Sequence, residues 1–217
     1  MTTPILDEHA ALNRIRMHLD DSQGRMLIGL MGKPGAGKST VSQYFLDRLP
    51  QSQVALVPMD GYHLSNRVLA LLVRSDRKGA PDTFDVPGFV SLLERIRRQL
   101  DEAVYFPVFD RSLEESIAAQ GVISPEVKVV LVEGNYLLHD QQGWGAVRHW
   151  LDECWMLDVD DELRRSRLIA RHVAFGKTEE QARAWVMGSD ERNAQTIAQG
   201  RARADFWLVP SDLSGPD

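Results

Sequence analysis

The sequence predicts an α/β fold, a three-layer sandwich in which about five parallel strands lie between two layers of helices. Short apolar segments alternate with helical patterns along most of the chain, and strand–helix alternation at these lengths is typical of a parallel sheet. The strand expected at 128–132 is apolar after its first residue. A strand covered by helices on both faces has this composition.

The apolar pattern predicts each element in order. An amphipathic helix is expected at about 5–20, where apolar residues recur every three or four positions. Pro87 suits the first turn of a later helix. Loops are expected at 74–86 and, unless a short helix forms there, at 110–126. The expected strands are 26–31, 54–57, 104–109, 128–132, 154–159 and 205–209. The remaining expected helices are 38–49, 66–73, 87–100, 143–151, 160–175, 178–188 and 190–199.

Composition excludes several classes of protein. The 217 residues suffice for a single domain, 1–217, whose core needs no disulfide. The 25 basic and 31 acidic residues give a net charge of −6, which disfavours nucleic acid and anionic membranes as partners. The single cysteine, Cys154, lies in an expected buried strand. The first twenty residues lack an apolar leader, and no run approaches the roughly 20 apolar residues of a membrane helix, so we expect a cytoplasmic protein.

A phosphate-binding motif lies between a predicted strand and a predicted helix. The run Gly32–Ser39 reads Gly-Lys-Pro-Gly-Ala-Gly-Lys-Ser, a complete G-x-x-x-x-G-K-S loop. Its glycines let backbone N–H groups surround phosphate oxygens, and the N-terminus of the next helix favours the same anion. Lys38, expected to be exposed before ATP binds, should reach the β- and γ-phosphates, and Ser39 should bind Mg²⁺. The predicted ATP-binding residues are Gly32, Pro34, Gly35, Ala36, Gly37, Lys38, Ser39 and Thr40.

The surroundings of this loop favour one class of P-loop protein. The Asn-Lys-x-Asp signature of GTPases is absent. The chain before the loop holds at most one helix and one strand, too little for a large motor or transporter ATPase. We therefore predict a P-loop NTPase fold of the nucleoside-kinase type and a small-molecule kinase.

Acidic residues follow three of the predicted strands. Asp60, Asp110 and Glu133 come after the strands at 54–57, 104–109 and 128–132, respectively. Ligands of open parallel sheets bind at the carboxyl ends of the strands. A kinase needs one carboxylate at the acceptor hydroxyl and another acidic group near Mg²⁺. The alternative at each position is an ordinary cap or turn residue, because loops favour such side chains.

Three stretches of the chain resemble the phosphoribulokinase/uridine kinase family, whose members include uridine, pantothenate and bacterial fructose transport system kinases. They are Met59–His63 (Met-Asp-Gly-Tyr-His), Arg77–Asp85 (Arg-Lys-Gly-Ala-Pro-Asp-Thr-Phe-Asp) and Val132–Leu138 (Val-Glu-Gly-Asn-Tyr-Leu-Leu). The resemblance extends from about residue 25 to 209. It implies a kinase that uses ATP and Mg²⁺, and family members are often oligomers, so a homo-oligomer is expected.

The resemblance also implies a role for each matching position. Asp60 would be the catalytic base, and Glu133 would act on Mg²⁺ directly or through water. Phe109 stands where uridine kinases carry a tyrosine, which disfavours a nucleoside acceptor, and the following Arg111 suits an anionic or polyhydroxy acceptor. The residues implied around the acceptor are Asp60, His63, Arg77, Lys78, Asp85, Asp110 and Arg111.

A helical lid is expected at about 164–190. At 100° per residue, Arg164, Arg167 and Arg171 share one face of the predicted helix, opposite an apolar face. A solvated basic face is the alternative. The family resemblance favours Arg167 and Arg171 as catalytic residues over the transferring phosphoryl group, because a guanidinium binds phosphate oxygens in pairs. A hinge is expected near Gly176.

The sequence thus predicts an ATP-dependent kinase that phosphorylates a hydroxyl of a small metabolite. Lys38, Asp60, Arg167 and Arg171 are the predicted catalytic residues, and Ser39 and Glu133 the predicted metal ligands. The acceptor stays open among a sugar such as fructose, a nucleoside such as uridine and a pantothenate-like acid. The alternative function is a regulatory ATPase without a small-molecule acceptor.

Overall fold

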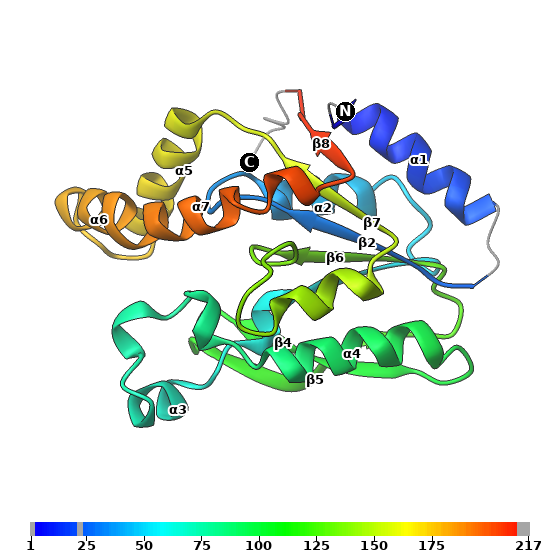
Figure 1. Cartoon of the computed structure of the whole chain (residues 1–217), viewed down its shortest axis with the longest axis horizontal. Coiled ribbons are helices and arrows are strands. Elements are labelled where there is room, and N and C mark those ends of the chain that lie inside the picture. Colours follow the sequence, from blue (N-terminus) through cyan, green and yellow to red (C-terminus); the bar gives the residue numbers. More distant parts are fainter. Residues whose placement is uncertain (1–2, 21–23, 212–217) are drawn as a thin grey trace.

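The computed structural model describes residues 3–20 and 24–211, which form a six-stranded parallel sheet with helices on both sides (Figure 1). The strand order is β1-β8-β7-β2-β6-β3. The strands are β1 (Ile5–Leu6), β2 (Met26–Met31), β3 (Val54–Pro58), β6 (Val129–Gly134), β7 (Glu153–Leu157) and β8 (Phe206–Leu208). The predicted α/β three-layer fold is therefore confirmed.

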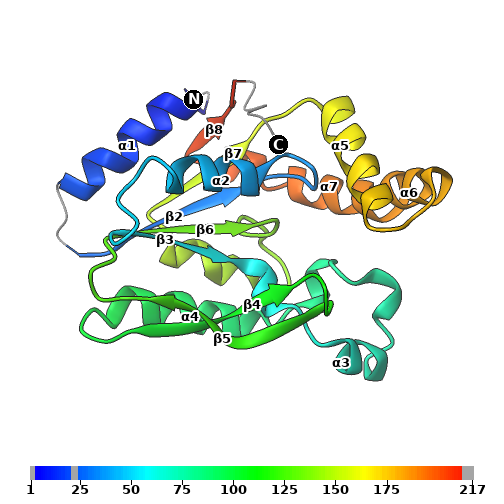
Figure 2. The ribbon, with the colours of Figure 1, turned by 180° about the vertical axis from the view of Figure 1, so that it is seen from behind.

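Two apolar cores lie on opposite faces of this sheet. Val129 and Leu131 belong to one core, with α1 (Glu8–Asp20) and α2 (Lys38–Leu46). Val130 and Val132 belong to the other, with α4 (Val86–Arg98). Figures 1 and 2 show α1 and α2 on one side of the sheet and α4 on the other. Both faces of β6 are thus covered, which explains its unbroken apolar sequence.

The remaining helices project from one end of the sheet (Figure 2). They are α3 (Asn66–Leu71), α5 (Asp161–Ala174), α6 (Glu179–Trp185) and α7 (Glu191–Ala198). A π-helical segment, Val186–Asp190, joins α6 to α7. Gly176, at the expected hinge, has a φ of +93° between α5 and α6. Among the helices that the model describes, none is both long enough and apolar enough to span a bilayer.

One predicted strand lies outside the parallel sheet. β4 (Val104–Asp110) pairs antiparallel with β5 (Glu115–Ile123), so the expectation of a loop or short helix at 110–126 was wrong. Most of β5 is exposed, which removes the apolar alternation that would have identified it. Pro107 lies where the register shifts, as suits a residue without a backbone N–H. β4 is therefore not a strand of the main sheet, although its end contacts the segment that follows β3.

Two further elements differ from prediction. The first helix begins at Glu8, because Ile5–Leu6 pairs with β8 as a sixth sheet strand. The segment Trp144–Trp150, expected to be an α-helix, is a 3₁₀-helix that follows Gly143 at φ +86°. The first change follows from a tertiary contact, since Ile5 and Leu6 are apolar enough for either a helix or a strand and pair with β8.

Candidate active site

Three neighbouring strands bring the predicted site together at one edge of the sheet. Leu30 of β2 and Pro58 of β3 are both paired with Glu133 of β6, so Glu133 lies between the ends of the two outer strands. The phosphate-binding loop follows β2, and Asp60 follows β3 within a 3₁₀ turn, Met59–Tyr62. The parallel register therefore determines which side chains meet at this edge.

The phosphate-binding loop adopts a conformation that needs glycine. Gly35 and Gly37 have φ of +80° and +82°. A Cβ at Gly35 would lie 2.4 Å from the Arg164 carbonyl oxygen of α5, so the loop and the lid helix are in close contact. Pro34, Gly35, Gly37, Lys38, Ser39 and Thr40 line the cavity described below. Gly32 and Ala36 do not line it; Ala36 packs into the core, and Gly32 contributes its carbonyl oxygen to Lys38.

Lys38 lies over the loop and is half-buried rather than exposed, contrary to expectation. Its ammonium donates to the Gly32 carbonyl oxygen at 2.9 Å. Burial lowers the pKa of Lys38 to about 8, although the charges of Glu133 and Asp60 oppose this shift. A cation with so few anionic contacts is suited to an anionic ligand such as a triphosphate.

Glu133 is held by two serines of α2. Its Oε1 accepts from Ser39 Oγ at 2.8 Å, and Ser42 Oγ lies 3.0 Å from its Oε2. In the described chain no three His, Cys, Asp or Glu side chains gather into a metal site. Mg²⁺ commonly binds through one or two protein oxygens together with substrate phosphates and water, and the Ser39–Glu133 pair fits that mode. Ser42 was not among the predicted site residues, although its position one helical turn after Lys38 was a usable signal.

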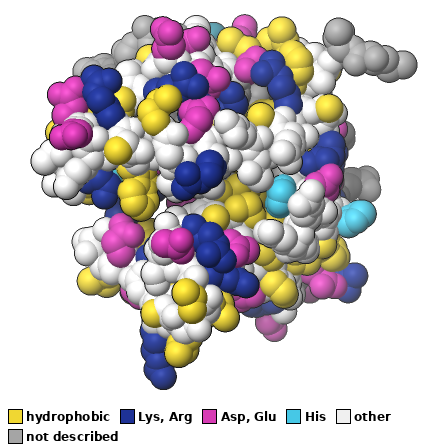
Figure 3. Space-filling model, turned by 60° about the vertical axis from the view of Figure 1, so that its left-hand side comes forward, with side chains coloured by type: hydrophobic (Ala, Val, Ile, Leu, Met, Phe, Trp, Pro, Cys, Tyr) yellow, Lys and Arg dark blue, Asp and Glu magenta, His cyan; other side chains and the backbone are white. Residues whose placement is uncertain are grey.

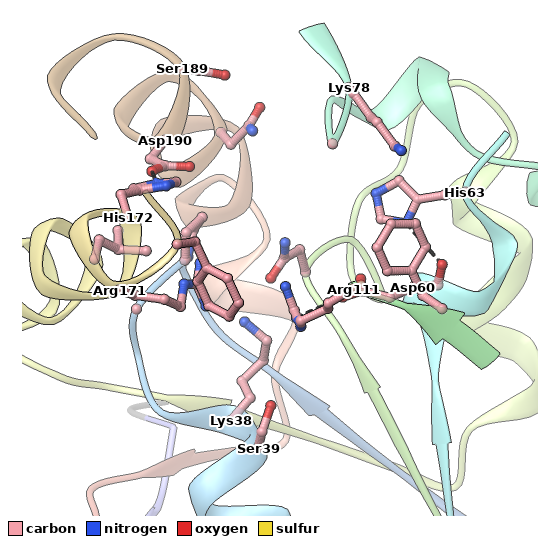
Figure 4. Close-up of a pocket in the computed structure, with 18 of the residues that line it drawn as sticks. Lys38, Ser39, Asp60, His63, Lys78, Arg111, Arg171, His172, Ser189 and Asp190 are labelled. Atoms are coloured by element: carbon pink, nitrogen blue, oxygen red, sulfur yellow. Dashed lines mark hydrogen bonds and ion pairs between the residues drawn. The ribbon is translucent and has the colours of Figure 1, made fainter. Parts of the chain in front are cut away.

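A cavity of about 730 Å³ opens above the sheet edge, between the lid helices and the acceptor side. Figure 3 shows a hollow with basic and acidic side chains around it. In the close-up, Lys38 and Ser39 rise from the loop, Arg171 comes from the lid, and Asp60 and His63 face them (Figure 4). The arrangement joins a phosphate-binding loop, a carboxylate and lid arginines in one space.

His63 occupies a fixed orientation on the acceptor side. Its Nδ1 donates to the Asp60 carbonyl oxygen at 2.8 Å, which leaves Nε2 as a hydrogen-bond acceptor. Its ring packs against Phe84 and Phe109, with centroid distances of 4.1 and 4.9 Å. Burial lowers the pKa of His63. The side chain is therefore suited to accept a hydrogen bond from a hydroxyl group.

Lys78 and Arg111 also line the cavity, but the side chain of Lys78 makes more contacts with the protein than that of Arg111. The Lys78 ammonium donates to Asn66 Oδ1 at 2.8 Å and to the Glu114 carbonyl oxygen at 2.6 Å. These bonds tie the loop around Lys78 to α3 and to the turn of the β4–β5 hairpin. Among the residues that the structure describes, Arg111 has one ion pair, 3.6 Å from its Nη2 to Asp60 Oδ2.

Three predicted acceptor residues do not line the cavity. Arg77 pairs with Asp82 at 2.9 Å. Asp85 caps α4 by accepting from the Gly88 N–H at 3.0 Å. Asp110 caps the hairpin turn, where its Oδ1 accepts from the Ser112 N–H at 2.8 Å. The structure thus gives all three the local ion-pair or capping contacts that are common in loops.

The lid arginines separate into two groups. Arg167 and Arg171 line the cavity, and a Cβ at Gly37 would lie 3.6 Å from Arg167 Nη1. Arg164 is fully buried and donates to both carboxylate oxygens of Glu191, at 2.8 and 2.7 Å. Arg164 therefore fixes α5 against α7, whereas the other two face the cavity.

The segment Ser189–Asn193 contributes to the cavity, although no role was predicted for it. In the structure, Ser189, Asp190 and Asn193 line the cavity. Asp190 Oδ2 lies 2.9 Å from His172 Nε2 of α5. The π-helical turn that presents Ser189 and Asp190 was not readable from the sequence, because it depends on the contact between α5 and α7. π-Helical turns are frequent at functional sites.

Residues 27–205 match the model of the phosphoribulokinase/uridine kinase family, and the chain belongs to this family. A candidate uridine kinase, C227.14 of Schizosaccharomyces pombe, is 31% identical over 215 residues, covering 94% of this chain and 92% of the other. The ATP-dependent kinase-like protein notR' of Aspergillus versicolor is 36% identical over 152 residues, covering 66% and 88%. The crystal structure of a candidate fructose transport system kinase from Silicibacter sp. TM1040 matches with a TM-score of 0.85 and 37% identity, covering 93% and 98%.

Proposed function

We propose that this protein transfers the γ-phosphoryl group of ATP to a hydroxyl group of a small metabolite. The observation that carries the proposal is the single cavity in which Lys38, Asp60 and Arg171 face one another. A phosphate-binding loop alone is common to many nucleotide-binding proteins. The carboxylate opposite the loop supports a phosphoryl acceptor in addition to ATP.

The proposed step needs little covalent chemistry from the protein. The acceptor oxygen forms a bond to the γ-phosphorus, the bond from that phosphorus to the bridging oxygen breaks, and ADP leaves. The hydroxyl proton passes to the Asp60 carboxylate. Lys38, Arg167 and Arg171 stabilise the negative charge of the transferring group, and the lid excludes water. Mg²⁺, held by Ser39 and Glu133 together with the phosphates, would neutralise charge on the β- and γ-oxygens.

The proposed acceptor is small and polar. The cavity wall on the Asp60 side combines Phe84 and Phe109 with the Nε2 acceptor of His63. One relative is described as a candidate uridine kinase and another as a candidate fructose transport system kinase, so a nucleoside and a sugar both stay candidate acceptors. A pantothenate-like acid is the third candidate. A cytoplasmic location and a homo-oligomer stay predictions.

The test is a screen for ATP consumption in the presence of Mg²⁺ with nucleosides, monosaccharides and pantothenate as separate pools. We expect one pool to raise ATP consumption well above the rate without acceptor. Asp60→Asn should lower the acceptor-dependent rate by about 10²–10⁴-fold, the usual contribution of a general base. ATP hydrolysis that no pool increases and that Asp60→Asn leaves unchanged would favour the regulatory ATPase instead.

A further inference from the structure

Arg111 reaches into the cavity from the acceptor side. It follows Asp110 in the turn of the β4–β5 hairpin, and its side chain is 56% exposed. In Figure 4 its guanidinium lies between Asp60 and Lys38 and points toward the phosphate-binding loop. Arg111 thus extends from the acceptor side toward the phosphate-binding side of the cavity.

The turn that carries Arg111 is held in place by several hydrogen bonds. Asp110 Oδ1 accepts from the Ser112 and Leu113 N–H groups at 2.8 and 3.1 Å. Glu115 Oε1 accepts from the Asn66 N–H of α3 at 3.0 Å. Because the backbone of this turn is ordered, Arg111 loses less conformational entropy when its side chain binds a ligand.

Three cationic side chains converge from three different elements. Lys38 comes from the start of α2, Arg171 from the lid and Arg111 from the hairpin, and all three line the cavity. Burial lowers the pKa of Arg171, and the positive charge of Arg111 lowers it further. The positive charges of Arg171 and Arg111 also lower the pKa of Lys38. Such mutual repulsion is relieved when a multiply charged anion binds between the three groups.

We propose that Arg111 contacts the γ-phosphoryl group of bound ATP and gives up its contact with Asp60 when ATP binds. This inference rests on the proposed function and changes the role that the sequence predicted for Arg111, from the acceptor to the phosphoryl group. The 3.6 Å pair with Asp60 is its only ion pair among the described residues, so the exchange breaks one contact. Nucleotide binding then frees the Asp60 carboxylate to take the hydroxyl proton.

Nucleotide binding tests this proposal without knowledge of the acceptor. ATP and ADP, each with Mg²⁺, are titrated calorimetrically into the wild type, Arg111→Ala, Arg111→Lys and Arg67→Ala. We expect Arg111→Ala to weaken ATP binding by about tenfold to a hundredfold, the range for a lost charged contact, and to change ADP binding less than about twofold. Arg111→Lys should fall between, because it keeps the charge and loses the planar fork.

Arg67 is the matched control, since it is an exposed arginine of α3 on the same side of the molecule and does not line the cavity. Its variant should bind both nucleotides as the wild type does. If Arg111→Ala keeps the ratio of ATP affinity to ADP affinity of the wild type, whether or not both affinities fall, the inference about Arg111 is overturned and the proposed function is not. A wild type that binds neither nucleotide would overturn the proposed function as well.

A double-mutant cycle tests the exchange itself. Asp60→Asn should strengthen ATP binding, because Asp60 no longer competes for Arg111 and no longer repels the phosphate. In an Arg111→Ala background the same change should give a smaller gain, since only the repulsion remains to be removed. Equal gains in the two backgrounds would show that Arg111 does not leave Asp60 when ATP binds.

Discussion

At the scale of single residues, Glu133 depends on α2 for its orientation. Ser39 and Ser42 hold its two carboxylate oxygens from one side of this helix, so the carboxylate cannot rotate freely. Asp60 lies across the cavity and carries no such brace. The two carboxylates thus have different surroundings, which allow one to serve the metal and the other to act as a base.

Substitutions of these carboxylates should separate a metal role from a base role. Glu133→Gln should raise the Mg²⁺ concentration needed for half-maximal ATP binding by at least about tenfold, because an amide is a poorer partner for Mg²⁺ or its waters. Ser42→Ala should raise it less. Asp60→Asn should not raise it, because this variant is expected to bind ATP more tightly. A Mg²⁺ titration of ATP binding measures all three, and a rise in Asp60→Asn without a rise in Glu133→Gln would mean that the two roles are exchanged.

His63 should make stability depend on pH. Because its pKa is lowered in the folded state, the unfolded chain binds more protons as the pH falls below the ordinary value of about 6.5, and the folded state loses stability there. Urea unfolding at pH 7.5, 6.5 and 5.5 should show a flatter acid side in His63→Asn than in the wild type. Part of the slope should persist, since burial also lowers the pKa of His139. The exposed His9→Asn is the control, and an equal slope in His63→Asn would contradict the prediction.

At the scale of elements, α5 of the expected lid is an amphipathic helix whose basic face lines the cavity. Arg167 and Arg171 face the cavity, while the apolar side chains of Leu163 and Val173 are partly exposed. The Arg164–Glu191 pair anchors this helix to α7. Anchoring the helix and lining the cavity are therefore divided between arginines of the same helix.

Breaking the anchor should destabilise the protein. Glu191→Ala leaves the fully buried Arg164 guanidinium with less compensation, and the loss of one partner of a buried ion pair costs about 3 kcal/mol. Urea unfolding measures the change. Glu179→Ala, which removes an exposed i,i+4 pair with Arg183 in α6, should alter stability little. Equal effects of the two substitutions on the free energy of unfolding would show that other groups neutralise the charge of the buried Arg164.

Lysine in place of the cavity-facing arginines should affect catalysis more than binding. Arg167→Lys with Arg171→Lys keeps the charge but loses the planar fork. With an acceptor from the screen, we expect kcat to fall more than about tenfold and the Kd for ATP to change less. Arg183→Lys, on exposed α6, is the control. Unchanged kcat and Kd in the double variant would mean that these arginines are only a solvated face.

At the scale of the whole molecule, the cavity is lined by three separate parts of the chain. The lid helices and the α3 side project from the same end of the sheet, with the phosphate-binding loop between them (Figure 2). A ligand that touches all three parts stabilises the folded state as a whole, because it binds only when they are assembled.

ATP with Mg²⁺ should therefore raise the melting temperature. At a concentration of about 100 times its Kd, ATP contributes about 2.7 kcal/mol, or about 5–10 °C for a chain of this size. Lys38→Ala should lose most of this shift and keep a melting temperature without ATP close to that of the wild type, since it removes a desolvated charge. Differential scanning calorimetry measures both quantities. A full ATP-dependent shift in Lys38→Ala would contradict the role of Lys38.

The sequence alone determined the parallel sheet, the phosphate-binding loop and the positions of Asp60 and Glu133. These features depend on local signals, namely an apolar run, glycines at fixed spacing and an acidic residue directly after a strand. Where strands are parallel and adjacent, their ends meet without further information. Neighbouring strands therefore placed these two carboxylates and Lys38 at one edge, as predicted.

Only the tertiary structure decided which other side chains reach the cavity. Arg164 and Arg171 share a helix face by angular arithmetic, yet Glu191 from a distant segment binds the first and leaves the second free. Asp110 and Arg111 are adjacent in sequence, yet the antiparallel hairpin directs one into its own turn and the other toward Lys38. The physical reason is that the direction of a side chain depends on partners far away in the sequence, which a local pattern does not contain.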